Sequence, residues 1–373
     1  MNEKGDRIQL LFIIGCMTNG GAERVISVLA NGLADSCNIA ILQIYRDKVD
    51  YELDSRIKVE AVHNETNNRV KRIAGRFSQI RRYVKRINPD LIISFIAEEN
   101  IYTLLSLWNS KYKIIISERN DPEKSPESRQ IRWLRDKVYK RADAMVFQTP
   151  DAKKYFSGPR YKRITKTIIP NPVKPDLPEH VFEKDCHRFI SACRLYEQKN
   201  IPMMIEAVRL LIEKGISCTL DIYGEGPLRS KLERMVQGYG LSKYIHLNHF
   251  TKEIHYEMTH GAAFVISSDY EGISNSMLEA LCIGIPVIAT DCPVGGARMY
   301  IKDGVNGYLV PCNNVCQLAE KMERVLVNRE ESEKIGMKAK ELKNDLETNK
   351  IIQKWKSLVR YMIGAPDLAA PRG

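Results

Sequence analysis

The 373-residue sequence lacks a C-x-x-C pair, a D-x-D triplet and any apolar run long enough to cross a membrane. Its longest nearly uncharged apolar stretches, 8–17 and 280–290, fall short of the ~20 residues that a spanning helix needs. The nine cysteines are scattered, so we expect reduced thiols rather than a disulfide framework or a zinc site. Residues 2–7 lead straight into an apolar run without a cleavage site, so we expect no secretory signal.

Positive charge is concentrated in the first half of the chain. The 57 Lys and Arg exceed the 46 Asp and Glu, and residues 1–180 hold 32 of these cations against 22 of the acids. Residues 69–86 contain eight cations and no acid, with apolar residues at spacings of three and four that are typical of an amphipathic helix. A second basic run lies at 129–141. We expect the apolar stripe to pack on a sheet and the outward cations to face an anionic membrane surface.

A nucleic acid is the other partner that such charge could serve, since the sequence pI is about 9.1. Aromatic residues, which stack on bases, are scarce in both basic runs. No recognised nucleic-acid-binding motif is present either. We therefore expect no nucleic-acid partner.

Short apolar runs alternate with helical patterns along both halves. In the first half we expect helices at 22–33 and 70–87 and buried strands at 8–15, 39–44, 91–95, 113–117 and 144–148. The pattern then restarts, with expected strands at 188–192, 217–223, 245–247, 263–267 and 286–290, and expected helices at 201–214, 228–239, 277–282, 315–327 and 331–363. Continuously apolar strands that alternate with helices indicate right-handed βαβ units and doubly wound parallel sheets.

Four prolines between positions 169 and 180 separate the two halves. No helix or central strand tolerates that density, so we expect a linker at 171–182 between domains at 1–170 and 183–349. We expect the last helix, 350–363, to pack back on the first domain and residues 364–373 to form a disordered tail. The predicted fold class is α/β, with two Rossmann-like domains facing each other across a cleft.

The first strand–helix junction is rich in glycine, because residues 15–23 read Gly-Cys-Met-Thr-Asn-Gly-Gly-Ala-Glu. Glycines after a buried strand let backbone N–H groups approach an anion at a helix N-terminus. The spacing fits neither G-x-G-x-x-G nor a P-loop, in which Gly21 and Ala22 would be Lys and Ser or Thr. An anion site and a plain tight turn both remain open for this segment alone.

Two weaker signals follow strands of the second half. Arg194 and Lys199 come after the strand at 188–192, where a guanidinium fork and an ammonium group can converge on one diphosphate. Gly224 and Gly226 belong to a G-E-G-P turn after the strand at 217–223. Taken singly, each is more typical of a solvated loop than of a ligand site.

The strongest motif is the stretch from 267 to 280. Glu271 and Glu279 lie eight residues apart, with a small, polar helix start at 272–276 between them. The two acids would contact different parts of one extended ligand, and free N–H groups between them would meet an anion. Capping preferences explain the serines at 274–276, but not an acid on each side of a glycine-led turn.

Six short motifs occur in a particular order along the chain. They are Gly20-Gly21-Ala22-Glu23, Ile169-Pro170-Asn171-Pro172, Arg194…Lys199-Asn200, Gly224-Glu225-Gly226-Pro227, Glu271…Glu279 and Asp303-Gly304-Val305-Asn306-Gly307. In this order they resemble the motifs of retaining glycosyltransferases of family 4, which have the GT-B fold. The resemblance is weak in the first half and strong from about residue 170 to 311.

The resemblance implies a nucleotide-sugar donor, commonly a UDP-sugar, on the second domain and an acceptor on the first. Arg194 and Lys199 would hold the diphosphate, and Glu279 would bind the ribose hydroxyls. Glu271 would contact the donor sugar, and Gly21 would approach the phosphate or sugar from the first domain. With Arg194, Lys199 and Glu271 as catalytic residues, the rest of the donor site would be Gly224, Gly272, Ile273, Ser274, Asn275 and Ser276.

The implied reaction moves a hexose or N-acetylhexosamine with retention of configuration. It would proceed by attack on the leaving-group face or through a covalent intermediate on Glu271. The implied acceptor is a glycan carried on a polyprenyl diphosphate, in bacterial surface-polysaccharide or glycoconjugate synthesis. A phosphorylase or an epimerase on the same two-domain frame is the alternative, which product analysis would distinguish.

The sequence departs from the common family pattern at two places. Many members carry a His after the strand equivalent to 113–117, whereas this chain has Glu118 and Arg119 there. With Gly20, these two are our candidates for acceptor or phosphate contacts. The second departure is His249, where a glycine is common.

A metal ion is not expected to take part. Without a D-x-D triplet, and with seven histidines that lack ligand spacing, the cations of the protein itself must neutralise the diphosphate. We therefore expect a metal-independent transferase with no cofactor. Its expected location is cytoplasmic, peripheral on the inner face of the plasma membrane.

Overall fold

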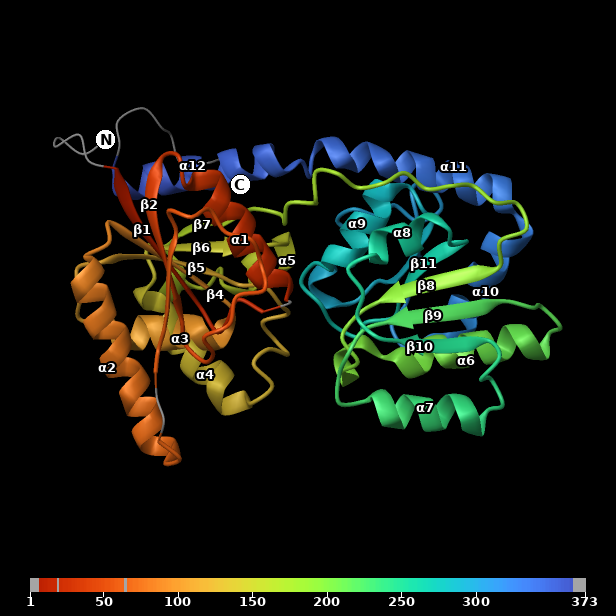
Figure 1. The fold of residues 1–373 in the computed structure, drawn as a ribbon, viewed down its shortest axis with the longest axis horizontal. Helices are drawn as coiled ribbons and strands as arrows, with labels where there is room; N and C mark the ends of the chain where they lie inside the picture. Colours follow the sequence, from red (N-terminus) through yellow and green to blue (C-terminus); the bar gives the residue numbers. More distant parts are fainter. Residues whose placement is uncertain (1–6, 19, 64–65, 365–373) are drawn as a thin grey trace. The chain divides into compact units, whose positions relative to one another are not determined.

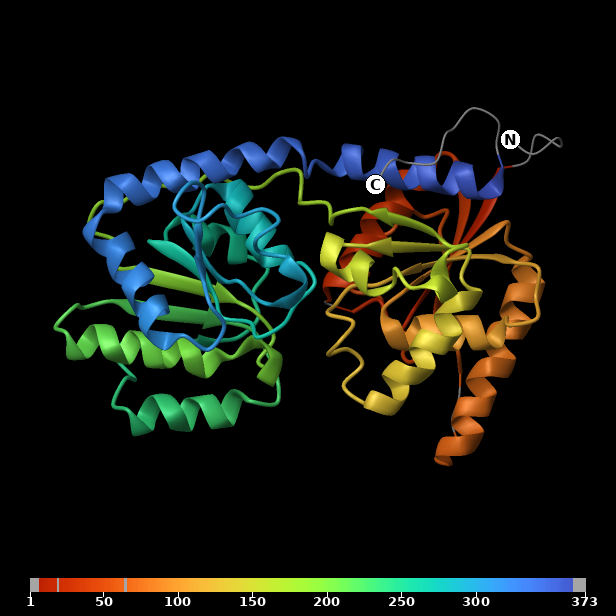
Figure 2. The same ribbon diagram turned by 180° about the vertical axis from the view of Figure 1, so that it is seen from behind.

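The structure is a computed structural model that describes residues 7–18, 20–63 and 66–364. The chain divides into two compact units, Met1–Pro172 with Thr348–Gly373 and Val173–Glu347. Each unit is built on a parallel sheet with helices on both faces (Figures 1 and 2). The predicted α/β class with doubly wound sheets is thereby confirmed.

In the first unit the strand order is β3-β2-β1-β4-β5-β6-β7. The strands are β1 (Ile8–Ile14), β2 (Cys37–Gln43), β3 (Lys58–Ala61), β4 (Leu91–Phe95), β5 (Lys113–Ser117), β6 (Ala144–Phe147) and β7 (Thr165–Ile168). One face is covered by α1 (Gly21–Leu33) and α12 (Thr348–Ile363), whose apolar residues share a core with the strands. The other face carries α2 (Arg69–Ile87), α3 (Ala97–Ser106) and α4 (Arg129–Val138), and α5 (Pro150–Tyr155) precedes β7 (Figures 1 and 2).

In the second unit the strand order is β10-β9-β8-β11-β12-β13. The strands are β8 (Arg188–Ala192), β9 (Thr219–Tyr223), β10 (Ile245–Asn248), β11 (Ala263–Ile266), β12 (Val287–Thr290) and β13 (Tyr308–Val310). One face packs on α6 (Ile201–Glu213), α7 (Arg229–Gly238) and α10 (Val315–Val327). The other packs on α8 (Ile254–Thr259), α9 (Asn275–Ile283) and residues that follow α11 (Arg329–Ala339).

The helix expected at 331–363 is interrupted. It is divided into α11, a 3-10 turn at Lys340–Asn344 and α12. The break coincides with the return of the chain to the first unit, where Trp355 is fully buried and stacks on Phe95 with ring centroids 5.6 Å apart. The expected tail, 364–373, lies outside the described residues except for Gly364.

The proline-rich segment expected as a linker is partly ordered against the second unit. Val173 and Leu177 are buried in its core, and the Val173 N–H donates to the carbonyl of Leu346. The division between the units therefore falls at Pro172, inside the predicted linker.

The predicted apolar stripe of helix α2 is buried only toward the C-terminal end of the helix. The Asn68 side chain caps it by accepting from the N–H groups of Val70 and Lys71. Ile80 and Val84 are buried, whereas Val70, at the start of the apolar stripe, is 76% exposed. No helix in the described ranges is both long and apolar enough to cross a bilayer.

Candidate functional site

The carboxyl ends of β8 and β11 bring Lys199 and Glu271 together. Lys199 Nζ lies 2.5 Å from Glu271 Oε1, with the two side chains 10% and 18% exposed. Ser268 donates to the second oxygen, Glu271 Oε2, at 2.9 Å. Ser267 fixes the backbone of the lysine turn, since its hydroxyl donates to the Lys199 carbonyl at 2.8 Å. A largely buried ion pair is therefore held at the edge where ligands of open α/β sheets bind.

The G-E-G-P turn supports the segment that carries Arg194. Gly224 has φ of +155°, and a Cβ there would lie 1.9 Å from the Cys193 carbonyl oxygen. A Cβ at Gly226 would lie 2.3 Å from the Leu195 carbonyl oxygen, so both glycines are required for close backbone packing. The Arg194 side chain is exposed, with its guanidinium carbon 5.2 Å from the centroid of the Tyr196 ring. Of the two predicted cations, the structure places Lys199 against Glu271 and leaves Arg194 at the surface.

The start of α9 is tied to the end of β8. Ser274 is the N-cap and accepts from the Met277 N–H at 3.4 Å. Ser276 donates to the Ala192 carbonyl at 2.9 Å. The loop at Gly272 packs so closely that a Cβ on Gly296 would lie 1.7 Å from the Gly272 carbonyl oxygen. These contacts fix the segment that also contains Ile273 and Asn275 at the first turn of the helix.

Glu279 has a partner that the sequence analysis missed. This carboxylate is 6% exposed, and its Oε2 lies 3.0 Å from His255 Nε2. His255 is on α8, a six-residue helix too short to give a periodic signal. Only the fold shows that this histidine, 24 residues earlier, lies against the second acid of the strongest motif.

At the carboxyl end of β1, the glycine pair precedes and opens helix α1. Tyr51 donates its hydroxyl hydrogen to the Gly20 carbonyl at 2.8 Å, and Gly21 is the first residue of the helix. Asn19, in the same predicted motif, lies outside the described residues. The predicted position of Gly20 and Gly21, after a buried strand and at a helix start, agrees with the structure.

Glu118 is turned into the interior of the first unit. It is 3% exposed, and Tyr139 donates to its Oε2 at 2.9 Å. Burial raises the pKa of this carboxyl to about 7. This position suits a residue that supports the loop after β5 better than one that contacts an acceptor.

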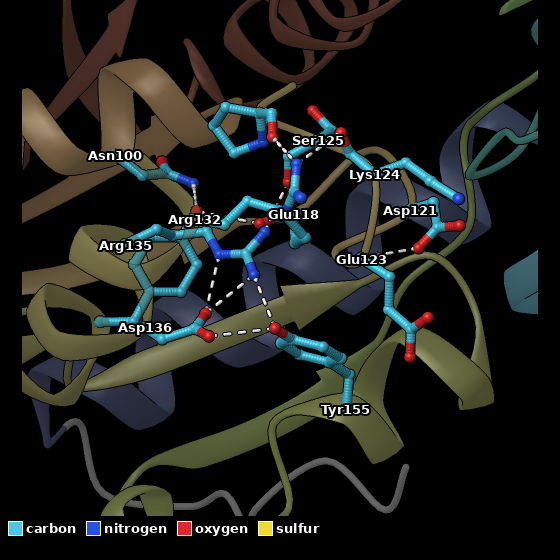
Figure 3. A network of polar contacts seen from close by, with 12 residues as sticks. Asn100, Glu118, Asp121, Glu123, Lys124, Ser125, Arg132, Arg135, Asp136 and Tyr155 are labelled. Atoms are coloured by element: carbon cyan, nitrogen blue, oxygen red, sulfur yellow. Dashed lines mark hydrogen bonds and ion pairs between the residues drawn. The ribbon is translucent and has the colours of Figure 1, made fainter. Parts of the chain in front are cut away.

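The same loop is held by a fully buried arginine. Arg135 donates to the Asp136 carboxylate at 2.8 Å, to the Tyr155 hydroxyl at 3.1 Å and to the Ser125 carbonyl at 2.5 Å. Figure 3 shows its guanidinium directed at these groups, close to Glu118. Nothing in the basic run at 129–141 distinguishes this buried cation from its exposed neighbours.

Arg119 faces a different environment from Glu118. Its guanidinium carbon lies 4.4 Å from the centroid of the Phe95 ring, and its Nη1 donates to Asn171 Oδ1 at 2.6 Å. Its Nε and Nη2 have no hydrogen-bond partner in the described part of the chain. Burial lowers the pKa of the guanidinium to about 9. An anion at the carboxyl end of β5 would satisfy the two remaining nitrogens.

The acids, histidines and cysteines form no metal centre in the part of the chain that the structure describes. All nine cysteines lie in that part and are unpaired. His246 bonds to Asp221 and His249 to Glu225, and each of these carboxylates also pairs with an arginine, Arg188 and Arg229 respectively.

Two family models match adjoining parts of the chain. Residues 19–177 match the model described as Glycosyltransferase Family 4, and residues 174–342 match the model described as Glycosyl transferases group 1. A similar curated protein is the GalNAc-alpha-(1->4)-GalNAc-alpha-(1->3)-diNAcBac-PP-undecaprenol alpha-1,4-N-acetyl-D-galactosaminyltransferase of Campylobacter jejuni. It is 27% identical over 361 residues, which cover 94% of this chain and 98% of that protein.

Solved structures show the same fold. Sucrose-phosphate synthase from Thermosynechococcus elongatus has a TM-score of 0.83 at 17% identity and covers 96% of this chain and 100% of its own. HepE of Anabaena, in complex with UDP and glucose, has a TM-score of 0.79 at 16% identity and covers 95% of this chain and 100% of its own.

Proposed function

The chain belongs to the family 4 glycosyltransferases, with a GT-B fold, and from that premise we propose that it transfers a hexose or N-acetylhexosamine from a UDP-sugar, with retention, to a lipid-linked glycan. The similar Campylobacter protein is named as an alpha-transferase acting on an undecaprenyl-diphosphate-linked glycan. HepE was solved with UDP and glucose. The observation that carries the proposal is the Lys199–Glu271 pair. This pair and the Glu279–His255 pair both lie within the region that matches the group 1 model.

In this proposal the donor lies at the carboxyl edge of the second sheet. Lys199 supplies positive charge to the diphosphate. Arg194, which is exposed and lies five residues earlier in the chain, binds the same group with its planar guanidinium. The N–H groups at the start of α9, from Ile273 to Ser276, add the positive end of the helix dipole. Glu279, oriented by His255, accepts hydrogen bonds from the ribose hydroxyls.

The reaction breaks the bond between the anomeric carbon and the diphosphate oxygen and forms a bond from that carbon to an acceptor hydroxyl. The hydroxyl proton passes to the departing diphosphate, whose charge Lys199 stabilises as it develops. Both carboxylate oxygens of Glu271 already have partners, in Lys199 and Ser268. This favours a role for Glu271 in positioning the donor sugar over a covalent intermediate.

A surface of the first unit that combines cations with exposed apolar side chains supports a lipid-linked acceptor. Helices α2 and α4 flank α3 on one face of the sheet (Figure 1). Val70, Ile131 and Trp133 are exposed on them among cations, and the Lys137 ammonium lies 3.7 Å from the centroid of the Trp133 ring. Exposed apolar side chains among cations are typical of interfacial helices.

A groove on the same surface adds to this argument. Its volume is about 730 Å³, and apolar side chains and three cations line it; the lining residues are Ala74, Phe77, Ser78, Arg81, Arg82, Lys85 and Leu105. Cations beside an apolar surface suit an anionic lipid. The enzyme is thus proposed to be peripheral, cytoplasmic, and independent of metal or other cofactor.

The direct test supplies the chain with UDP-glucose, UDP-galactose, UDP-N-acetylglucosamine or UDP-N-acetylgalactosamine, with and without EDTA. We expect UDP release with one of these donors, unchanged by EDTA. NMR of the first-formed product should show the α-configuration of the donor. A β-product, or phosphate-dependent release of a sugar phosphate, would contradict the proposal.

A further inference from the structure

An unusual backbone corner lies between β4 and α3. Ile96 has φ of +73°, a conformation that is strained for a β-branched residue. Its N–H donates to the Ser117 carbonyl at 3.2 Å, and its carbonyl accepts from the Asn100 N–H at 2.9 Å. The corner starts α3 immediately after the strand and places Glu99 in the first helical turn, at the carboxyl edge of the first sheet.

Glu99 is buried at this edge with an unused acceptor. Glu99 is only 4% exposed, and its Oε2 has no hydrogen-bond partner among the described residues. Leaving a buried polar atom unpaired is unfavourable, and a bound ligand is one way in which such an atom is satisfied.

The end of β1 leaves room for this carboxyl group. A Cβ on Gly15 would lie 2.4 Å from Glu99 Oε1 and 2.9 Å from Tyr45 Cδ2. Position 15 must therefore be glycine, because any side chain there would collide with the Glu99 carboxyl group. Gly15 is followed by the loop to Gly20 and Gly21, the first-unit residues already proposed to face the substrates.

The surroundings of Glu99 favour a neutral, hydroxyl-rich ligand. The charged and titratable groups that act on it are Glu98 on its own helix, Glu23 on α1, Arg76 on α2 and Tyr45 after β2. Arg76 is occupied by the aromatic rings, with its guanidinium carbon 4.6 Å from the centroid of Tyr45. Three carboxyl groups against one cation disfavour a phosphate. No set of three metal-ligating side chains is present within the described ranges, which disfavours a cation site.

We propose that Glu99 is a specificity-determining residue that binds a hydroxyl group of the acceptor sugar at the carboxyl edge of the first sheet. The inference rests on the proposed function, because it assumes that an acceptor sugar is bound by the first unit. Burial raises the pKa of Glu99 to about 8, so near neutral pH the group is largely a carboxylic acid. In that form it donates one hydrogen bond and accepts another, which matches the hydroxyls of a sugar.

The test uses the full chain, its preferred UDP-sugar and the octyl α- and β-glycosides of glucose, galactose, N-acetylglucosamine and N-acetylgalactosamine as acceptors. Glu99→Met keeps the volume and removes the hydrogen bond, and Glu99→Gln restores part of it. We expect Glu99→Met to raise the acceptor KM at least tenfold, with the donor KM and donor hydrolysis within twofold of the wild type. The acceptor KM of Glu99→Gln should lie between those of the wild type and Glu99→Met. Glu127→Gln, an exposed acid of the same unit, is the matched control and should behave as the wild type.

Deoxy versions of the best acceptor locate the contact. Removal of the hydroxyl that Glu99 binds should raise KM at least tenfold for the wild type and less than threefold for Glu99→Met. An unchanged acceptor KM in both Glu99 variants would overturn the inference. So would a wild type that hydrolyses the donor and transfers to no glycoside. A wild type that neither binds nor hydrolyses any UDP-sugar would instead refute the proposed function.

Discussion

At the carboxyl edge of the second sheet Lys199 and Glu271 neutralise each other, whereas at the edge of the first sheet Glu99 and Arg119 carry polar atoms without a partner in the described ranges. The Lys199–Glu271 pair is therefore electrostatically satisfied before any ligand binds. A diphosphate that binds there must draw Lys199 away from Glu271, so its affinity is reduced by the interaction that it replaces.

A ligand at the first edge displaces no protein partner from these atoms. A sugar hydroxyl at Glu99, or an anion at Arg119, would gain hydrogen bonds that the protein alone does not make. Substitutions at the two edges should consequently have different effects on stability and activity. Breaking the pair in the second unit should reduce both stability and activity, whereas apolar replacement at the first edge should reduce activity while preserving stability.

The largest effect is expected for Lys199→Ala. Loss of the ammonium group should reduce kcat/KM for transfer about 10³-fold, equivalent to about 4 kcal/mol of transition-state stabilisation. It also leaves Glu271 partly buried without its cation, which should reduce the free energy of unfolding by about 2 kcal/mol. Steady-state UDP release and urea denaturation measure the two quantities. Lys338→Ala, in an exposed pair with Glu341, is the control, and an equal loss in it would contradict the assignment.

The two units should also differ in membrane binding. Each Lys or Arg near an anionic surface contributes about 1 kcal/mol, so Arg82→Gln with Lys85→Gln should weaken binding to phosphatidylglycerol vesicles about 30-fold. Co-sedimentation at fixed ionic strength measures this. The paired control is Lys334→Gln with Lys338→Gln on α11 of the second unit, which should bind as the wild type. Equal weakening in both doubles would indicate a non-specific charge effect.

A smaller effect is expected for His255, which acts through Glu279. His255→Ala should raise the donor KM about tenfold, or about 1.4 kcal/mol, because Glu279 loses its orienting partner. The acceptor KM should stay within twofold. His187→Ala, exposed in the same unit, is the comparison. A change in kcat with an unaltered donor KM would contradict a positioning role at the ribose.

For Glu99 we also expect a pH dependence of stability. Burial raises the pKa of Glu99 from 4.5 to about 8, so between these values the folded chain holds a proton that the unfolded chain releases. Stability must then fall as pH rises through this window, and Glu99→Met removes that loss. We expect Glu99→Met to gain about 3.5 kcal/mol relative to the wild type between pH 5 and 8, as measured by urea denaturation. The contribution of Glu118, whose pKa is also raised, is the same in both proteins and cancels. A constant difference across this range would show that Glu99 is ionised in the folded state.

The sequence predicted the central strands well because their apolar runs are continuous. Strands β4, β5 and β8 have the predicted bounds, while β3 and β7 were missed because their sequences, Lys-Val-Glu-Ala and Thr-Lys-Thr-Ile, are short and half polar. The motifs placed Lys199 and Glu271 after separate strands, but their pairing was not predicted, because only the strand order shows that these strands are neighbours.

Contacts that depend on tertiary packing were not predictable in this way. Glu99 lies in an ordinary Ala-Glu-Glu-Asn sequence, and only the fold brings Gly15 beside it. Glu118 was a candidate for an acceptor or phosphate contact, and its hydrogen bond from Tyr139, 21 residues later in the chain, could not be predicted from the sequence. The same limit applies to the contact of Arg135 with Tyr155 and of His255 with Glu279, which join different elements.

The most direct test of this difference between the two edges is UDP release with and without acceptor, compared in the wild type, Lys199→Ala and Glu99→Met. We expect Lys199→Ala to lose both donor hydrolysis and transfer, and Glu99→Met to lose transfer at limiting acceptor while hydrolysing the donor as fast as the wild type. Full hydrolysis by Lys199→Ala, or an equal loss of both reactions in a stably folded Glu99→Met, would contradict the division of donor and acceptor between the two sheets.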